Sequence, residues 1–430
     1  LDVDSPALDA GSNSAANDAG LTTDQRGLIR IVDHDGDGTA TVDIGAVEGL
    51  APIVVAGLAD DLPGADTDGL MGLREALASA ASQPGFDVIR FDESVFSGAA
   101  RTLTLSEGEL LIDSDVDIQG PTAGSLTLSG GGLGRVVHVL PGSTAWVSDI
   151  TITGGAVTDE AGAGLLNAGT LLLSGVTVMG NAAAGPGGSG GGLSSTGDLT
   201  LHNATISGNT SMGSGGGLFV AEGTARVVNS TVLGNAADID DDAVGEGGGI
   251  AVLAGAAVTV SNTIVAGNGR GTAGPVADDV AGVFDAESSF NFIGVIDGST
   301  GLSSGLGTQY GAVGSSIDPG LGALGWYDAA GGDPLGAWTA EAGPTMVHGL
   351  RPGSPVTDAG SNELASSAGL TSDQRGLPRV RDGVDNTIAR IDVGAFEQQT
   401  PLNQAPTISQ VNTLGGAAEG KPFVITYEML

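Results

Sequence analysis

Three aspartates at alternating positions form the clearest candidate metal-binding motif of the chain. Asp33, Asp35 and Asp37 are followed by a glycine, and such a start can wrap carboxylate oxygens around calcium while the glycine makes the sharp turn. The motif is partial, because Ile44 stands where an EF-hand loop places its last acidic ligand, and Asp43 comes one residue early. Asp33, Asp35, Asp37 and Asp43 are therefore either a calcium site or an acidic hairpin in water.

A second acidic run, Asp238, Asp240, Asp241 and Asp242, lies in a predicted loop just before a glycine cluster. Like charges at a loop tip repel one another and favour water, although the same oxygens can bind a divalent cation. We favour the solvated interpretation and keep calcium as the alternative. No other cofactor is expected.

The residues that polysaccharide-cleaving enzymes need are scarce. A lyase takes a proton next to a carboxylate with a basic residue, yet the only lysine, Lys421, lies outside the predicted coils. Asp278 and Asp279 are adjacent acids without an accompanying histidine or arginine motif, and the four histidines are scattered. Arg226 and Arg270 could face one groove, but a solvated surface position is the favoured interpretation. No catalytic residue is assigned.

Composition excludes several further classes of protein. The chain has 430 residues and a formal net charge of −37, which repels the phosphates of nucleic acids. Cysteine is absent, so disulfides, thiolate zinc sites and cysteine nucleophiles are excluded. No apolar run approaches the ~20 residues that cross a bilayer. Such an acidic surface stays soluble where salt screens its self-repulsion, which favours a marine or saline habitat.

A long repeat divides the chain. The segment from Ser5 to Arg30 returns as the segment from Ser354 to Arg379, with 18 of 26 positions identical, and both copies continue at equal length to Glu48 and Glu397. Both contain Asp-Gln-Arg-Gly, which we interpret as a local clasp between carboxylate and guanidinium. We interpret residues 1–48 as the C-terminal cap of a preceding module and residues 49–397 as a complete module.

A shorter repeat lies between these copies. Asn181, Asn209, Asn235 and Asn268 each follow a glycine and a short stretch of alternating apolar and small polar residues, which predicts strands. Six residues earlier stand Gly175, Asn203, Asn229 and Asn262. Stacked coils would place both sets of asparagines in files where side-chain amides can hydrogen-bond, and would align Ile206, Val232 and Ile264 in one apolar column.

These repeats predict an all-β fold, a right-handed parallel β-helix like the solenoid of pectate lyases. The coils should span about 87–300 and an irregular closing cap about 301–397. Residues 68–83 predict a short N-terminal capping helix: Asp68 is a plausible N-cap, Leu70, Leu73 and Leu77 form one stripe, and Gly85 ends it. The alternative of a catalytic or partner helix is less favoured, because the stripe has ordinary core spacing.

Several motifs in combination resemble a known family. They are LREAL at 73–77, the strand FDVIRF, coils with GGGL and ISGN, NFIGV from Asn291, and the closing SPxxDAG and DQRG segments. They are similar to bacterial secreted β-helix proteins with a CSLREA-type N-terminal motif and a choice-of-anchor Q domain, over roughly 60–397 and again over 1–48. Met71 and Gly72 replace the family's Cys-Ser. After a linker at 398–406, residues 407–430 resemble the start of a cadherin-like or Ig-like tandem repeat.

The resemblance implies a large modular protein outside the cell or on a bacterial surface. We therefore expect a non-enzymatic structural or adhesive module whose partners are neighbouring modules of the same polypeptide, and surface glycans or other cells. The alternatives are a lyase or glycoside hydrolase acting on acidic polysaccharide, or a glycan-binding module, because β-helices also host such enzymes. Glycan binding needs exposed aromatic platforms, and the available residues are Trp146, Trp326, Trp338, Tyr310 and Tyr327.

Overall fold

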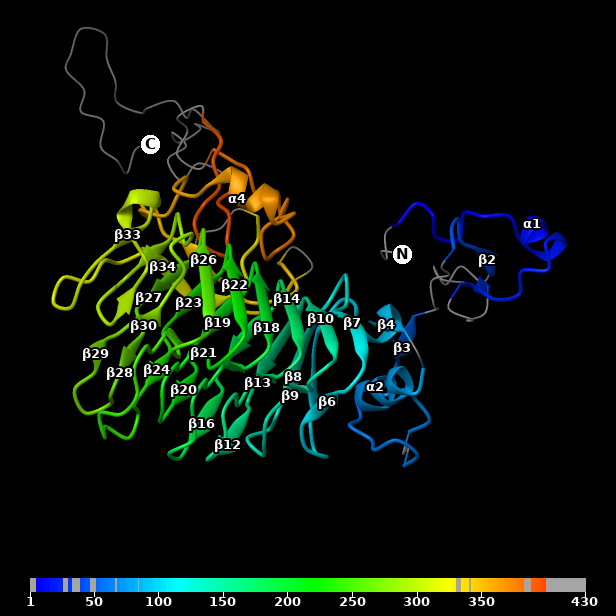
Figure 1. Ribbon diagram of the computed structural model, residues 1–430, viewed down its shortest axis with the longest axis horizontal. Helices are drawn as coiled ribbons and strands as arrows, with labels where there is room; N and C mark the ends of the chain where they lie inside the picture. The colour runs from blue at the N-terminus through cyan, green and yellow to red at the C-terminus, as the bar shows by residue number, and fades with distance from the viewer. Residues whose placement is uncertain are drawn as a thin grey trace, which may run out of the picture.

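The structure is a computed structural model, and it describes residues 5–25, 30–32, 39–46, 52–65, 68–83, 85–329, 334–339, 342–382 and 388–399. Its body is a solenoid whose coils stack along the long axis of the molecule (Figure 1). A complete coil passes through four sheets, which we number I to IV in the order in which the chain crosses them. The prediction of a parallel β-helix is confirmed.

The strands of each sheet come from successive coils. Sheet I contains β6 (Leu110–Ile112), β9 (Val137–Val139), β13 (Leu165–Asn167), β17 (Leu193–Ser195), β21 (Leu218–Val220), β25 (Ile250–Val252), β30 (Val280–Val283) and β32 (Ser299–Thr300). Sheet II contains β3 (Ile53–Val55), β4 (Phe86–Phe91), β7 (Asp115–Gln119), β10 (Thr144–Ser148), β14 (Thr170–Ser174), β18 (Asp198–His202), β22 (Thr224–Val228) and β26 (Ala257–Ser261).

The remaining two sheets complete the coil. Sheet III contains β5 (Ala100–Thr104), β8 (Ser125–Ser129), β11 (Ile150–Thr153), β15 (Thr177–Met179), β19 (Thr205–Ser207), β23 (Thr231–Leu233), β27 (Ile264–Ala266), β31 (Phe292–Ile293) and β33 (Gln309–Tyr310). Sheet IV contains β12 (Ala156–Thr158), β16 (Ala182–Ala184), β20 (Thr210–Ser211), β24 (Ala236–Ala237), β28 (Gly269–Arg270) and β29 (Val276–Ala277). Neighbouring strands run parallel in all four sheets, except that β28 and β29 are antiparallel.

The register of sheet III corrects one predicted column. Ile206 is paired with Val232, as expected, but Val232 is paired with Val265, and Ile264 is the partner of Thr231. Because side chains alternate between the faces of a strand, this shift of one residue moves Ile264 out of the solenoid interior. Val265 lies in the main apolar core, whereas Ile264 packs with residues of the C-terminal part of the chain.

Helix α2 (Leu73–Ala81) caps the first coils but is shorter than the predicted 68–83. Its N-cap is Gly72, whose N–H donates to the Glu75 carboxylate at 3.0 Å. Asp68 instead accepts the N–H of Leu70 in the preceding turn, and Leu70 is 46% exposed. The buried stripe is Leu73, Ala76, Leu77 and Ala80, so the helix does cover the N-terminal end of the core.

After β33 the chain forms what we call the closing cap. It contains a short antiparallel pair, β34 (Leu321–Gly325) and β35 (Val347–Leu350), and helix α4 (Asn362–Ser367). The small elements α3 (Glu93–Phe96) and η1 (Ser304–Leu306) lie within the coil region. Rather than ending the stack, the closing cap packs along sheet III, where Thr205 is hydrogen-bonded to Gln374 across 169 positions of sequence.

The N-terminal segment is a separate small unit in Figure 1, made of α1 (Asn13–Asp18), β1 (Ile31–Val32) and β2 (Thr41–Val42). Strands β1 and β2 pair antiparallel. Among the described residues, no helix has the length and apolar character that a membrane crossing requires. The predicted segment 407–430, and the linker before it from residue 400 onward, lie outside the described residues.

Candidate functional site

One corner of the solenoid carries a continuous file of asparagines, which we call the corner ladder: Asn181, Asn209, Asn235 and Asn268. It lies between sheets III and IV, and each side chain is at most 2% exposed. The Oδ1 of Asn209 accepts the N–H of Asn181 at 3.0 Å and its Nδ2–H at 2.9 Å, and the same pair of bonds joins each later rung. These buried polar groups are therefore satisfied by one another.

Glycines on the adjoining turn make room for the ladder. A Cβ atom added to Gly217 would lie 2.7 Å from the carbonyl oxygen of Gly249 and 3.0 Å from Nδ2 of Asn235. Gly192 meets the next coil and Asn209 in the same way. The glycine clusters seen in the sequence are thus required by the close approach of successive coils around the amides.

An aspartate ends the corner ladder. Oδ1 of Asp279 accepts both the N–H and the Nδ2–H of Asn268, each at 2.8 Å, and burial raises the pKa of Asp279 to about 6. Its neighbour Asp278 accepts the N–H of Gly247 at 3.1 Å and lies 3.6 Å from the Arg270 guanidinium. The two acids of this pair therefore have different roles: Asp279 accepts structural hydrogen bonds, and Asp278 forms an ion pair at the surface.

A second file stands at the corner between sheets II and III, and we call it the docking corner: Asp149, Gly175, Asn203, Asn229 and Asn262. All five have a left-handed backbone, with φ between 49° and 66°, which asparagine, aspartate and glycine tolerate best. Only one amide pair joins this file in the described residues, from Nδ2 of Asn262 to Oδ1 of Asn229 at 3.1 Å. Burial raises the pKa of Asp149 to about 7.

The docking corner mainly binds the closing cap. Asn203 donates to the carbonyl of Ser372 at 2.9 Å and accepts from Arg379 at 2.7 Å. Asn262 accepts the N–H of Ser361 at 2.8 Å and donates to its carbonyl at 3.0 Å. Of the three asparagines that the sequence suggested as a second ladder, Asn203 and Asn262 therefore join the coils to the closing cap, whereas the side chain of Asn229 is bonded, among the described residues, only to Asn262.

Behind these contacts lies a buried charge cluster in the closing cap, formed by Asp373, Arg375, Arg379, Asp392 and Glu397. Arg375 is bonded to Asp373 at 2.6 Å, which confirms the clasp predicted for this copy of Asp-Gln-Arg-Gly. Burial raises the pKa of Asp392 to about 7 and raises that of Glu397 well above its usual range. The three acids and two arginines thus hold the cap as a compact polar core.

Only one of the four predicted metal residues, Asp43, lies among the described residues. Asp33, Asp35 and Asp37 lie outside the described residues, and Asp43 accepts the N–H of Asp9 at 2.7 Å. Asp392, the counterpart of Asp43 in the second copy, accepts the N–H groups of Asp358 and Gln398. Its role there is that of a structural acceptor.

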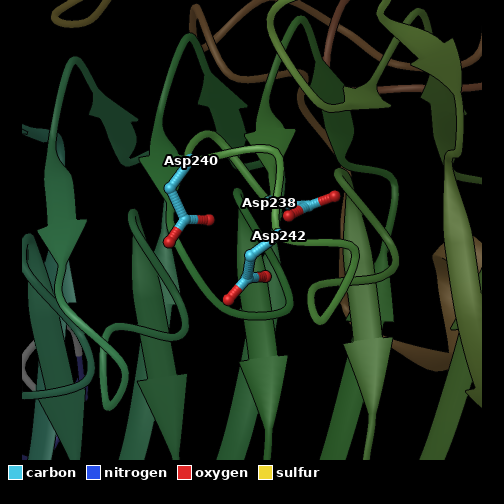
Figure 2. A group of neighbouring side chains, drawn as sticks. All are labelled: Asp238, Asp240 and Asp242. Atoms are coloured by element: carbon cyan, nitrogen blue, oxygen red, sulfur yellow. The ribbon is translucent and has the colours of Figure 1, made fainter.

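The second acidic run offers a closer grouping. Figure 2 shows Asp238, Asp240 and Asp242 around one loop. One carboxylate oxygen of each lies within 4.8 Å of those of the other two. Asp238 is buried and bonds the N–H of Ala243 at 3.0 Å, whereas Asp240 and Asp242 are exposed. Asp241 turns away to bind Thr272 of the next coil. Three oxygen donors on a surface loop suit calcium chemically, and the same geometry suits a solvated loop.

One groove in the described part of the chain, of about 470 Å³, is lined by Arg74 and Asp113, and two others combine an arginine with acids that lie against it. One, of about 400 Å³, is lined by Glu109, Arg135 and Glu160, and Arg135 is bonded to both glutamates. The other, of about 100 Å³, holds Arg270 with Glu246 and Asp278. Arg226 lies on sheet II and Arg270 on sheet IV, so these two arginines do not share a groove.

Few aromatic residues are placed to stack on a sugar. Trp146 is 42% exposed on sheet II, where its ring packs 4.8 Å from that of Phe86, and Tyr310 is also 42% exposed. Tyr327 is buried against Phe396 in the closing cap. The indole N–H groups of Trp326 and Trp338 are buried.

A family model agrees with this architecture. This model, described as right-handed β-helix region, matches residues 113–271. A search of curated proteins finds no significant match. The crystal structure of pectate lyase Pel9A aligns with 81% of this chain and 98% of that chain, at 12% identity and a TM-score of 0.36. The family match and the sheet topology together make residues 113–271 a right-handed parallel β-helix.

Proposed function

We propose that this chain is a non-enzymatic structural module, a stiff β-helical spacer or adhesive segment of a large secreted or surface protein. One observation carries the proposal: the corner ladder runs from the N–H of Gly155, which binds Asn181, through four asparagines to Asp279 without a missing bond. Such a file joins coil to coil through buried amides. It resists bending because any tilt between coils lengthens several of its hydrogen bonds.

The chemistry of the grooves supports the same proposal. The guanidinium of Arg135 is used by Glu109, Glu160 and the carbonyls of Ala161 and Gly162. A lyase base must reach the substrate proton, whereas this arginine is 8% exposed and engaged on every side. The three described histidines lie on sheet I, sheet II and β35, and one of them, His138, lies 3.3 Å from Glu109 of the Arg135 groove.

Incubation with a panel of acidic polysaccharides tests the proposal. We expect neither new reducing ends nor unsaturated products from the full chain. An Arg135→Gln variant is the matched control: product that forms with the parent chain and disappears with this variant would replace the structural proposal by an enzymatic one at that groove. Binding without turnover would instead favour the glycan-binding alternative, and it should then depend on Trp146.

The setting in which such a spacer works follows from the resemblance and the charge. We propose that residues 301–397 are a choice-of-anchor Q type closing segment, and that the parent protein is extracellular in a bacterium of saline habitat. The net charge of −37 supports the saline habitat, because screening at 1 M NaCl relieves most of the repulsion between exposed charges. Melting temperatures in 0.1 M and 1 M NaCl check this, and a value that does not rise with salt would contradict it.

A further inference from the structure

The two copies of the long repeat have the same internal fold. Helices α1 and α4 begin after the serine N-caps Ser12 and Ser361, at equivalent positions. In the first copy Asp43 accepts the N–H of Asp9 at 2.7 Å, and in the second Asp392 accepts that of Asp358 at 2.7 Å. The N–H of Gln25 binds the carbonyl of Ala46 as that of Gln374 binds Ala395. The described residues between 5 and 46 therefore make the same internal contacts as their counterparts in the closing cap.

One face differs between the copies. Val393 is 2% exposed in the closing cap, whereas its counterpart Ile44 is 57% exposed. Gln374 is buried, and its counterpart Gln25 is exposed. A Cβ atom added to Gly394 would lie 2.7 Å from Ile264 of the solenoid, while one added to Gly45 would meet nothing within 4 Å. The first copy keeps these contacts of the cap, but none of the described residues covers this face.

In the second copy, the equivalent face of the closing cap packs on the side of the solenoid. Its contacts there form a row that we call the Thr/Asn flank: Thr177, Asn203, Thr205, Thr231 and Asn262 of sheet III and its docking corner. Gln374 accepts the hydroxyl proton of Thr205 at 2.6 Å and donates to Thr177 at 2.9 Å. The N–H of Ala395 donates to Thr231 at 3.0 Å, and that of Gly394 to the carbonyl of Asn262 at 2.8 Å.

The first copy retains the groups that make these contacts. Gln25 is equivalent to Gln374 in the repeat, Gly45 and Ala46 are equivalent to Gly394 and Ala395, and Ser12 is equivalent to Ser361. Backbone donors and one glutamine do most of the recognition, so the partner is defined by the spacing of its coils rather than by its charge. In this chain the flank is already covered by the closing cap, so the matching surface must belong to another β-helix.

We propose that the exposed face of residues 5–46, formed by Ser12, Thr23, Gln25, Ile44, Gly45 and Ala46, binds the Thr/Asn flank of a second parallel β-helix. The partner needs threonine at the start of successive sheet III strands and a left-handed asparagine at the corner before them. This inference rests on the proposed modular function and names the surface by which modules would meet. The two proposals can fail separately. The polysaccharide assay tests whether the solenoid is catalytic, and a positive result there would leave this inference intact.

Disulfide trapping between separate chains tests the proposal, because the native sequence has no cysteine. The first chain carries Gln25→Cys with its closing cap intact. The second carries Thr205→Cys together with Gln374→Ala and Arg379→Ala, which loosen its cap and open its flank. We expect a disulfide between positions 25 and 205, identified by peptide mass. A first chain with Asp18→Cys, on the exposed end of α1, should give at least tenfold less.

A segment exchange provides the second measurement should the loosened chain not fold. Residues 5–48 replace residues 354–397 in the full chain, which places the first copy on the native flank. We expect hydrogen exchange to show sheet III still protected, and Ile44→Asp to lower the melting temperature in this grafted position but not at its original one. Equal trapping at positions 25 and 18, no trapping, or an unprotected flank in the exchanged chain would each overturn the proposal.

Discussion

The corner ladder and the docking corner use the same amino acid for different purposes within the same coils. In the corner ladder each asparagine has its amide turned along the stack, so that Asn209 bonds the coils on either side of its own. In the docking corner a left-handed backbone leaves Asn203 and Asn262 free to bind the closing cap. Among the described residues of the two files, the asparagines that bond the closing cap are left-handed, although the left-handed Asn229 is bonded to Asn262 of the next coil.

Breaking the corner ladder in its middle should have the largest effect. Asn209→Ala leaves the N–H of Asn181 without its acceptor and removes the donor to Asn235, all in a buried corner. We expect a loss of roughly 3–5 kcal/mol in the free energy of unfolding, from unsatisfied groups and a small cavity. Urea unfolding measures it.

Asn17→Ala, at an exposed position of α1, is the matched control for this change. Its effect should stay within about 0.5 kcal/mol. Equal losses for the two variants would show that the ladder adds no stability beyond that of an ordinary surface asparagine.

Breaking the docking corner should release the cap and spare the coils. Asn262→Gly removes the side-chain bonds to Ser361 while keeping the left-handed backbone, as Gly175 does naturally in the same file. We expect a loss of about 1–3 kcal/mol, and faster hydrogen exchange in the closing cap than in sheet I. A uniform increase in exchange over all coils would contradict a separate docking role.

The acidic ends of the two files predict a smaller, pH-dependent effect. Burial raises the pKa of Asp279 to about 6 and that of Asp149 to about 7, above the ~4 of an unfolded aspartate. The folded state therefore binds these protons more tightly, and this contribution to stability is full below pH ~4 and is lost as pH rises through 6 to 7.

We accordingly expect the melting temperature to be several degrees higher at pH 5 than at pH 8. The measurement is made in 1 M NaCl, which screens the general repulsion between surface acids. A melting temperature that stays flat or falls as the pH is lowered would contradict raised pKa values for the buried acids Asp149, Asp279 and Asp392 taken together.

Calcium should have the smallest effect. The loop with Asp238, Asp240 and Asp242 offers one buried and two exposed acids, which suits at most the weak affinity of extracellular calcium sites. At tenfold excess over a millimolar dissociation constant, binding adds about 1.4 kcal/mol. An increase in melting temperature with calcium should vanish in Asp240→Asn/Asp242→Asn, and no change with chelator would remove calcium from this loop.

Much of the solenoid could be predicted because each coil repeats a local requirement. A left-handed glycine before each ladder asparagine, and glycines opposite it, are needed in every coil, so they recur visibly in the sequence. The register was less secure. Ile206, Val232 and Val265 each stand three residues before their ladder asparagine, whereas Ile264, predicted for the interior column, stands four residues before Asn268. Likewise, the helix begins at Leu73 because Glu75 caps Gly72, which outweighs the cap expected from Asp68.

The contacts of the closing cap could not be predicted in the same way. Gln374 meets Thr205 and Arg379 meets Asn203, across 169 and 176 positions of sequence, and no periodicity relates these partners. The file of Asn203, Asn229 and Asn262 was visible, but the sequence does not show that its amides face outward. The positive φ at those three positions is what separates them from the ladder, and it follows from the corner geometry.

The lateral path of the closing cap has a mechanical consequence. Because Gln374, Gly394 and Ala395 lie against the side of the coils, the chain leaves at residue 399 beside the stack rather than from its tip. Tension applied further along the chain would break these cap bonds one after another, starting at the C-terminal edge of the cap. We expect the coils to bear load only after the cap has detached, so that the cap would extend before the coils unfold.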